Sequence, residues 1–306
     1  MPIAKRQILK TNLEVSSICL GTMTFGSPLV ESDAIDMVHW AMDHGINFFD
    51  TANMYEGYNR SIGSSGGIAE EILGKALKDR RERAVVATKL GMKVGDQPED
   101  EFTSPAAIRK HLDMSLRRLK MERVDIYYLH KPDPVTPMVD ILAALDVAIK
   151  SGKICHYGVS NYSAQEFAHL LEVADANKLP RPVINQPAYS MINRGVENDL
   201  LPLCEKEQIS VAPFHVLQAG LLTGKYRRSQ PPPADSRKAE KSVWVWDLTD
   251  EVFDKIEQAE KDAHSKGRTL IEHAVLAVLE QPSVVSVLLG AKRIDQLKSL
   301  VAIVEN

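Results

Sequence analysis

The sequence lacks several features that would place it in common classes of protein. Its net charge is -4 with 25% charged residues, so it has none of the basic excess that binding to nucleic acid requires. No run of about 18 apolar residues occurs that would span a membrane. Residues 1–15 contain no continuous apolar stretch of the kind found in signal peptides. We therefore expect a cytoplasmic protein with neither nucleic acid nor membrane as a partner.

Cysteine is also scarce. Cys19, Cys155 and Cys204 lie far apart in the chain, without the close spacing of a metal knuckle or a redox pair, and their odd number argues against a disulfide framework. We interpret them as buried thiols in a reducing compartment and expect no metal.

A glycine-rich fingerprint after a first strand is missing as well, which argues against a doubly wound nucleotide-binding domain.

Short apolar segments instead alternate with amphipathic segments along the chain. Predicted strands occupy residues 16–20, 46–49, 84–89, 124–130, 154–160, 182–189, 209–214 and 283–289. Predicted helices occupy residues 33–43, 68–78, 105–119, 138–150, 164–177, 196–206, 250–265 and 269–280. Helical crossovers of this length join parallel strands. We therefore predict an α/β fold, a single (β/α)8 TIM barrel domain over residues 1–306, preceded by a hairpin that turns at Thr11-Asn12.

Polar side chains stand at or just beyond the carboxyl ends of these predicted strands. Asp50, Lys89 and His130 end the second, third and fourth strands. Later strands end in Ser160, Asn161 and Gln186. Barrel active sites lie where the carboxyl ends converge. An acid, a lysine and an imidazole gathered there would be costly without a function, so the sequence predicts an active site at this end.

Tyr55 follows Asp50 by five residues, and Gly57 follows two residues later. This spacing places the phenol on a loop or a short helical turn beside the carboxylate. Such a pair can donate protons or orient a ligand. Taken alone, the two residues are equally compatible with a surface aspartate and a half-buried tyrosine.

Eight motifs, in order, cover nearly the whole chain. They are LGTMTFG at 20–26, FFDTANMYEGY at 48–58, ATKLG at 87–91, DIYYLHKPDPVTP at 125–137, YGVSNY at 157–162, NQPAYS at 185–190, GLLTGKY at 220–226 and LLGAK at 288–292. Together they resemble the aldo-keto reductase superfamily, and most closely its bacterial branch that also resembles the potassium-channel beta subunits. The resemblance implies a barrel fold and a nicotinamide cofactor.

The resemblance also implies catalytic roles for four residues. Tyr55 is the expected proton donor, Lys89 the cation beside it, Asp50 the carboxylate paired with Lys89, and His130 the group that orients the substrate carbonyl. A free tyrosine has a pKa near 10 and keeps its proton at neutral pH, and a nearby ammonium lowers that pKa. Hydride must come from a cofactor, because no side chain donates one.

Cofactor contacts are implied in the same way. Ser160, Asn161 and Gln186 match positions that hold the nicotinamide carboxamide, and Phe214 matches the ring that stacks on the nicotinamide. Lys292, next to Arg293, suits a 2′-phosphate and favours NADPH over NADH. The other expected contacts are Gly21, Thr22, Met23, Asp50, His215, Leu217, Gln218, Gly220, Lys225, Gly290 and Gln296.

Two segments depart from the family pattern. His215-Val216-Leu217 stands where Ser-Pro-Leu is usual, which removes a serine contact, and Ser299-Leu300 replaces the acid-asparagine pair that contacts adenine. Residues 227–247 form a long irregular stretch, and loops of this length are often functional, so we interpret it as a lid. The simpler alternative is a solvated excursion.

The leading hypothesis is an NADPH-dependent reductase of aldehydes or ketones to alcohols. Its substrate is a small carbonyl compound, with a sugar-derived one and the reverse reaction on sugars or polyols left open. The expected substrate contacts are Met23, Tyr55, Tyr58, His130 and Trp244. A cofactor-binding module that senses redox state or binds a partner, with slow turnover, is the first alternative. A metal-dependent hydrolase or lyase is the second, and it predicts further clustered carboxylates and histidines at strand ends.

Overall fold

The computed structural model describes residues 3–305 and is organised around eight parallel strands. They are β3 (Ile18–Gly21), β4 (Phe48–Asp50), β5 (Val85–Leu90), β6 (Val124–Leu129), β7 (Ile154–Ser160), β8 (Ile184–Gln186), β9 (Ser210–Val211) and β10 (Val287–Leu289). Their order in the sheet is β10-β3-β4-β5-β6-β7-β8-β9, and every neighbouring pair is parallel.

The sheet closes on itself between its two edge strands. Val211 in β9 forms a parallel bridge to Val284, just before β10. The amide of Val211 donates to the Ser283 carbonyl at 2.8 Å, and the amide of Val285 donates to the Val211 carbonyl at 2.9 Å. The closed sheet confirms the predicted (β/α)8 barrel.

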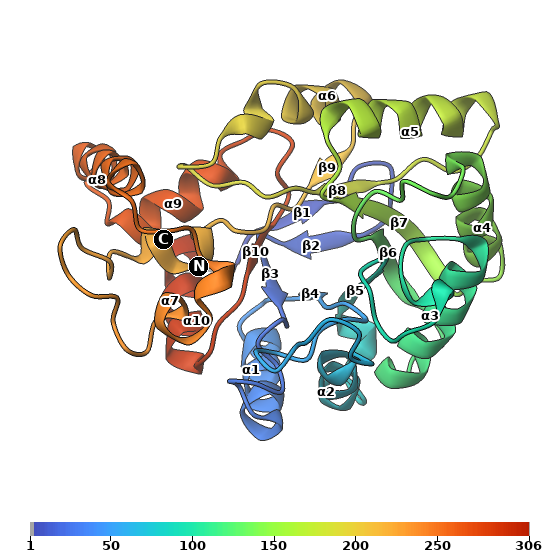
Figure 1. Ribbon diagram of the computed structural model, residues 1–306, viewed down its shortest axis with the longest axis horizontal. Coiled ribbons are helices and arrows are strands. Elements are labelled where there is room, and N and C mark those ends of the chain that lie inside the picture. Colours follow the sequence, from blue (N-terminus) through green and yellow to red (C-terminus); the bar gives the residue numbers. More distant parts are fainter. Residues whose placement is uncertain (1–2, 306) are drawn as a thin grey trace.

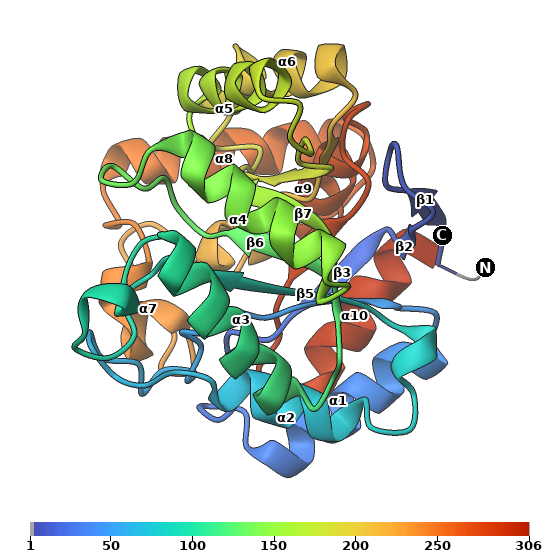
Figure 2. The ribbon, with the colours of Figure 1, turned by 90° about the vertical axis from the view of Figure 1, so that its right-hand side faces the viewer.

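Helices surround the strands on the outside. They are α1 (Glu31–Asp43), α2 (Ile68–Ala76), α3 (Pro105–Leu119), α4 (Met138–Lys150), α5 (Ala164–Ala176), α6 (Leu200–Glu207), α8 (Asp250–Ser265), α9 (Leu270–Leu279) and α10 (Ile294–Glu305). Figure 1 shows these helices as a ring around the labelled strands, and Figure 2 shows α1 to α4 stacked along one side of that ring. No helix within residues 3–305 is long and apolar enough to cross a bilayer.

A hairpin precedes the barrel, as the Thr11-Asn12 turn predicts. Its strands are β1 (Lys5–Gln7) and β2 (Glu14–Ser16). Ile8 and Val15 from the hairpin are fully buried against Phe48 and other residues of the barrel interior. The Leu9 amide donates to the Ser210 hydroxyl at 2.9 Å, at the start of β9. The hairpin therefore plugs the amino ends of the strands and leaves the carboxyl ends for the site.

The alternation of side chains along each strand decides which residues face the interior. In β5, Val85 and Ala87 belong to the inner core and Val86 to the outer core beneath the helices. Because successive side chains point to opposite faces, Lys89 faces the interior and Thr88 faces the helices. The same period places Asp50 inside β4, since Phe48 is inner and Phe49 is outer.

Several predicted elements differ from the structure: β8, β9 and β10 are shorter than the predicted strands, and α10 was not predicted. The helix expected to start at residue 196 begins at Leu200, because Gly195–Glu197 form a separate 3-10 turn, η3, and the Asp199 carboxylate caps the Leu200 amide at 2.6 Å. The stretch 227–247 is not wholly irregular. It contains the short helix α7 (Arg237–Glu240) and the 3-10 turn η5 (Ser242–Trp244). The other 3-10 turns are η1 (Arg81–Arg83), η2 (Pro98–Asp100) and η4 (Gln218–Thr223).

Candidate active site

The carboxyl end of the barrel brings Asp50, Lys89 and Tyr55 into contact. The Lys89 ammonium forms an ion pair with the Asp50 carboxylate, and both side chains are fully buried. Lys89 also donates to the Thr51 carbonyl at 2.9 Å and lies 3.4 Å from the Tyr55 hydroxyl. The Gln186 side-chain amide donates to the other Asp50 oxygen at 2.8 Å. Four residues from three strands and one loop thus form a single polar centre.

Burial and charge act in opposite directions on this centre. Burial raises the pKa of Asp50, and Lys89 only partly offsets that effect. Burial alone would lower the pKa of Lys89, but Asp50 and Tyr55 outweigh it and the pKa is raised. Burial likewise raises the pKa of Tyr55 against the opposing influence of Lys89. The phenol therefore holds its proton at neutral pH beside a charged ammonium, and it can act as an acid.

His130 completes the centre from the residue after β6. Its ring lies edge-on to Tyr55, with ring centroids 5.9 Å apart. Burial lowers the pKa of His130 well below its usual value, and Lys89 and Lys131 lower it further. Its Nδ1 is buried without a partner within residues 3–305. The imidazole is therefore neutral at physiological pH and can donate one hydrogen bond to a carbonyl oxygen.

The amide and hydroxyl side chains at the ends of β7 and β8 surround this centre. The Ser160 hydroxyl donates to the Gln186 carbonyl at 2.8 Å. The Asn161 side-chain amide donates to the His130 carbonyl at 2.9 Å, and Asn161 has a positive φ of 62°. This contact holds the exposed Asn161 amide beside the polar centre.

Positive charge gathers where phosphate groups were expected. Lys225 is half-buried and has no ion-pair partner in the described part of the chain. Burial lowers the pKa of Lys225, and Lys292 and Arg237 lower it further against the influence of Asp235. A phosphate would relieve this concentration of positive charge, so the side chains present fit a dinucleotide. Arg237 lies in the long stretch after β9, where no sequence motif marks it.

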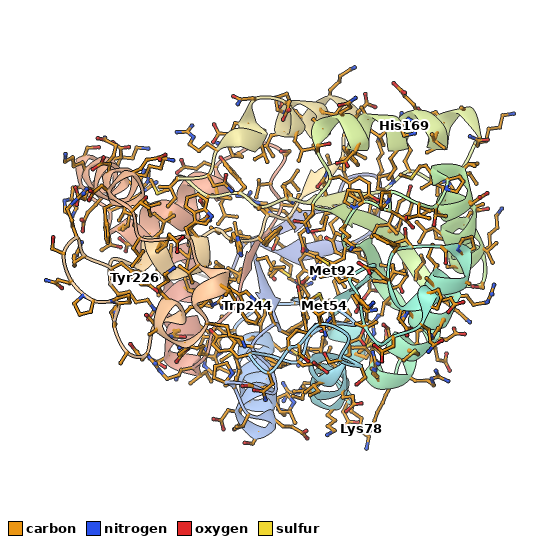
Figure 3. All side chains as sticks on the ribbon, viewed as in Figure 1. Met54, Lys78, Met92, His169, Tyr226 and Trp244 are labelled. Carbon is orange, nitrogen blue, oxygen red and sulfur yellow. The ribbon has the colours of Figure 1, made fainter. Side chains whose placement is uncertain are left out.

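The loop 227–247 contacts the segment that carries Tyr55. The Arg237 guanidinium donates to the Tyr58 hydroxyl at 3.1 Å, and the Trp244 and Tyr58 rings meet edge-on with centroids 5.4 Å apart. Figure 3 shows Trp244, Met54 and Met92 inside the ring of helices, whereas Lys78 and His169 lie toward its outer side. The loop therefore reaches from β9 to the β4–α2 connection.

The remaining predicted residues fall into three groups. Met23 and Phe214 are half-buried near strand ends, and His215 is exposed with a positive φ of 61°. Thr22 and Gln218 are instead buried and engaged within the protein: the Thr22 hydroxyl donates to the Asp50 carbonyl at 3.1 Å, and Gln218 accepts from Ser190 at 3.0 Å. At the end of the barrel, Leu217 precedes η4, Gly220 lies within it, Gly21 ends β3, and Gly290 follows β10.

Lys292 forms a hydrogen bond with Gln296 and an ion pair with the loop 227–247. The Lys292 amide donates to the Gln296 side chain at 2.9 Å. Its ammonium binds the Glu240 carboxylate at 2.7 Å and the Asp235 carbonyl at 2.6 Å. Arg293 pairs instead with Asp295 at 3.1 Å. Lys292 is thus close to the cationic cluster, and Arg293 also approaches the loop, because its guanidinium lies 3.8 Å from the Asp235 carboxylate.

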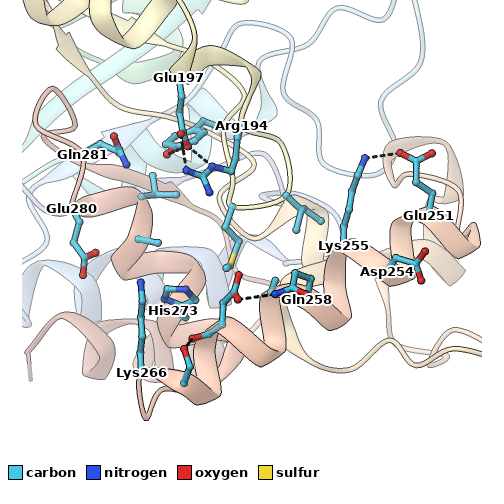
Figure 4. Close-up of a pocket in the computed structure, with 18 residues that line it drawn as sticks. Arg194, Glu197, Glu251, Asp254, Lys255, Gln258, Lys266, His273, Glu280 and Gln281 are labelled. Atoms are coloured by element: carbon cyan, nitrogen blue, oxygen red, sulfur yellow. Dashed lines mark hydrogen bonds and ion pairs between the residues drawn. The ribbon is translucent and has the colours of Figure 1, made fainter.

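A separate groove of about 950 Å³ lies between α8, α9 and the segment after β8 (Figure 4). Ion pairs of 2.8 Å between Arg194 and Glu197 and of 2.7 Å between Glu251 and Lys255 line it. None of the predicted site residues lines this groove.

Within residues 3–305 no group of three or more His, Cys, Asp or Glu side chains is arranged to hold a metal ion.

The barrel and the polar centre at its carboxyl end define an enzyme-like (β/α)8 protein. A family model for the aldo/keto reductase family matches residues 17–306. The chain therefore belongs to the aldo/keto reductase family of oxidoreductases, as the motifs predict.

Individual relatives cover almost the whole chain. A "Probable voltage-gated potassium channel subunit beta" of Arabidopsis thaliana is 34% identical over 94% of this chain and 87% of its own length. The L-glyceraldehyde 3-phosphate reductase of Escherichia coli K12 is 31% identical over 97% of this chain and 86% of its own. The solved glycerol dehydrogenase of Gluconobacter oxydans superimposes with a TM-score of 0.79 at 30% identity, over 98% of this chain and 89% of that one.

Proposed function

We propose that the protein is an NADPH-dependent oxidoreductase that reduces an aldehyde or ketone to an alcohol. The observation that carries this proposal is the buried contact of 3.4 Å between the Tyr55 hydroxyl and the Lys89 ammonium. A protonated phenol beside a charged ammonium is a proton donor whose conjugate base is stabilised by that charge.

Each residue of the centre has a role in this reaction. Bound nicotinamide supplies the hydride. Tyr55 gives its proton to the oxygen of the reduced carbonyl, and Lys89 stabilises the resulting tyrosinate. Asp50 holds the ammonium in place through their ion pair. His130 donates a hydrogen bond to the carbonyl oxygen and so orients the substrate. Met23, Tyr58 and Trp244 form the apolar wall.

The same proposal assigns the cofactor contacts. Ser160, Asn161 and Gln186 hold the carboxamide, and Phe214 stacks on the nicotinamide ring. Lys225, Arg237 and Lys292 bind phosphate, including the 2′-phosphate that distinguishes NADPH from NADH. The loop 227–247 acts as a lid over the dinucleotide, supported by its contacts with Tyr58.

The proposed setting is a cytoplasmic single-domain barrel that acts on a small carbonyl compound and not on nucleic acid. The names of two relatives refer to L-glyceraldehyde 3-phosphate and to glycerol. These names support a substrate derived from a sugar or a polyol.

A nucleotide titration tests the proposal. Purified protein is titrated with NADPH and then NADH while tryptophan fluorescence is followed, and 4-nitrobenzaldehyde is added to the tighter complex. We expect tighter binding of NADPH and an aldehyde-dependent loss of nicotinamide absorbance. Binding without turnover would favour a redox sensor. Failure to bind either nucleotide would overturn the proposal.

A further inference from the structure

Catalysis by Tyr55 and Lys89 depends on their separation, and the two residues belong to different elements. Tyr55 lies on the loop between β4 and α2, whereas Lys89 lies in β5. Their hydroxyl and ammonium groups are 3.4 Å apart. Displacements of about 1 Å at a reacting group can cost on the order of a hundredfold in rate, so whatever fixes these two elements matters for the reaction.

The first connection runs from the outer face of β5 to α2. Thr88, the neighbour of Lys89, faces the helices, and its hydroxyl donates to the Glu70 carboxylate at 2.6 Å. Both side chains are fully buried. Glu70 lies in the first turn of α2. A buried carboxylate needs several partners, and this one ties the strand of Lys89 to the helix that follows the Tyr55 loop.

The second connection runs through α3. The Arg118 guanidinium pairs with the other Glu70 oxygen at 3.1 Å and donates to the Ser65 carbonyl at 3.1 Å. Gly67 makes this approach possible, because a Cβ there would lie 2.3 Å from the Arg118 Nε. Ser65 belongs to the Tyr55 loop, so one arginine joins that loop to the carboxylate that holds Thr88.

The third connection is through the backbone. The Ala69 amide, next to Glu70, donates to the carbonyl of Tyr55 at 3.1 Å. The Asn53 amide, earlier in the same loop, donates to the carbonyl of Lys89 at 3.0 Å. The first turn of α2 therefore holds Tyr55 by its backbone and the Lys89 strand by a side chain.

We propose that Glu70 is a positioning residue that sets the distance between Tyr55 and Lys89. It does so by holding Thr88 directly and the Tyr55 loop through Arg118. Glu70 faces away from the barrel interior and acts only through these neighbours. The inference rests on the proposed reductase function of Tyr55 and Lys89.

Thr88→Val and Thr88→Ser test the proposal as a matched pair. Valine keeps the volume of threonine but removes the hydroxyl that donates a hydrogen bond to Glu70, whereas serine keeps this hydroxyl. For Thr88→Val we expect kcat with 4-nitrobenzaldehyde to fall about tenfold, with NADPH affinity and KM within about twofold of the parent. The pKa seen in the pH profile of kcat should rise, because Lys89 would stabilise tyrosinate less well. Thr88→Ser should keep most of kcat and the original profile.

A second variant covers the case in which Thr88→Val does not fold. Glu70→Gln keeps an acceptor for Thr88 but loses the charge that pairs with Arg118, and it should lower kcat in the same direction by a smaller factor. Unchanged kcat and pH profile in a folded Thr88→Val or Glu70→Gln variant, even with a lower melting temperature, would overturn the positioning role. A parent protein that binds NADPH but reduces no aldehyde would instead overturn the proposed function, and the positioning role with it.

Discussion

At the scale of single residues, Tyr55 is the group on which the proposed chemistry depends. Tyr55→Phe removes only the hydroxyl that lies 3.4 Å from Lys89. We expect aldehyde reduction to fall by about a thousandfold or more, because a general acid contributes roughly 10²–10⁴ in rate. NADPH affinity, measured by fluorescence, should stay within about twofold. A large loss of NADPH affinity would mean that Tyr55 holds the structure together rather than donating a proton.

Lys292 is the residue expected to distinguish the two nucleotides. Lys292→Ala removes a cation from the cluster around Lys225 and should weaken NADPH binding about tenfold, since one charge-assisted contact is worth about 1.5–3 kcal/mol. NADH affinity should change by less than about twofold. Lys298→Ala is the matched control, because Lys298 is exposed on α10, the helix that begins two residues after Lys292. Equal losses of affinity for both nucleotides would contradict the assignment to the 2′-phosphate.

The lowered pKa of His130 should make the stability of the folded protein depend on pH. Its pKa in the folded protein is well below 6.5, because of burial first and then Lys89 and Lys131. Below about pH 6.5 the unfolded chain takes up a proton that the folded protein does not, so the free energy of unfolding falls by about 1.4 kcal/mol per pH unit from this residue. Urea unfolding near pH 7.5 and near pH 5.5 measures the loss, and His130→Asn should reduce it. An identical pH dependence in the variant would contradict a buried neutral imidazole.

At the scale of elements, the loop 227–247 is the segment that we expect to govern nucleotide exchange. Tyr58→Phe removes the acceptor of the 3.1 Å hydrogen bond from Arg237 but keeps the ring that meets Trp244. Loss of one hydrogen bond to a charged group should speed NADPH release about tenfold, measured by displacement in a stopped-flow instrument. Tyr189→Phe, in the groove of Figure 4, is the control and should leave the release rate unchanged.

The elements also show what sequence patterns can and cannot predict. The helix predicted over residues 105–119 is confirmed as α3, and Ser104 caps it by accepting from the Ala107 amide at 3.2 Å. The start of α6 was missed, because a helical pattern does not distinguish a 3-10 turn at residues 195–197 from the first turn of an α-helix. Arg237 was missed for a related reason: its role depends on a long-range hydrogen bond to Tyr58 and on its electrostatic effect on Lys225, which no local pattern records.

At the scale of the whole molecule, the alternation of strands and helices was sufficient to predict the barrel. Strand-end positions then predicted that Asp50, Lys89 and His130 would converge, and they do. The network of Glu70, Thr88 and Arg118 was not predicted, because the outer faces of strands show only that a residue is buried and not which partner it meets. The short β9, with two residues, likewise depends on closure of the sheet.

That closure has a consequence for how the protein opens. Local stability varies across a fold, and amide hydrogen exchange reports which segments open first. The seam between β9 and β10 is held by the parallel bridge between Val211 and Val284. A hydrogen bond of 3.0 Å from the Leu288 amide to the Pro213 carbonyl also crosses it. We expect the amides of Val285 and Leu288 to exchange faster than those of β5 and β6. The proposed phosphate contacts, Lys225, Arg237 and Lys292, follow β9 and β10 in the chain, so NADPH should slow exchange at the seam more than in β5. Bound NADPH would then stabilise the contact between β9 and β10, where we expect the barrel to open first.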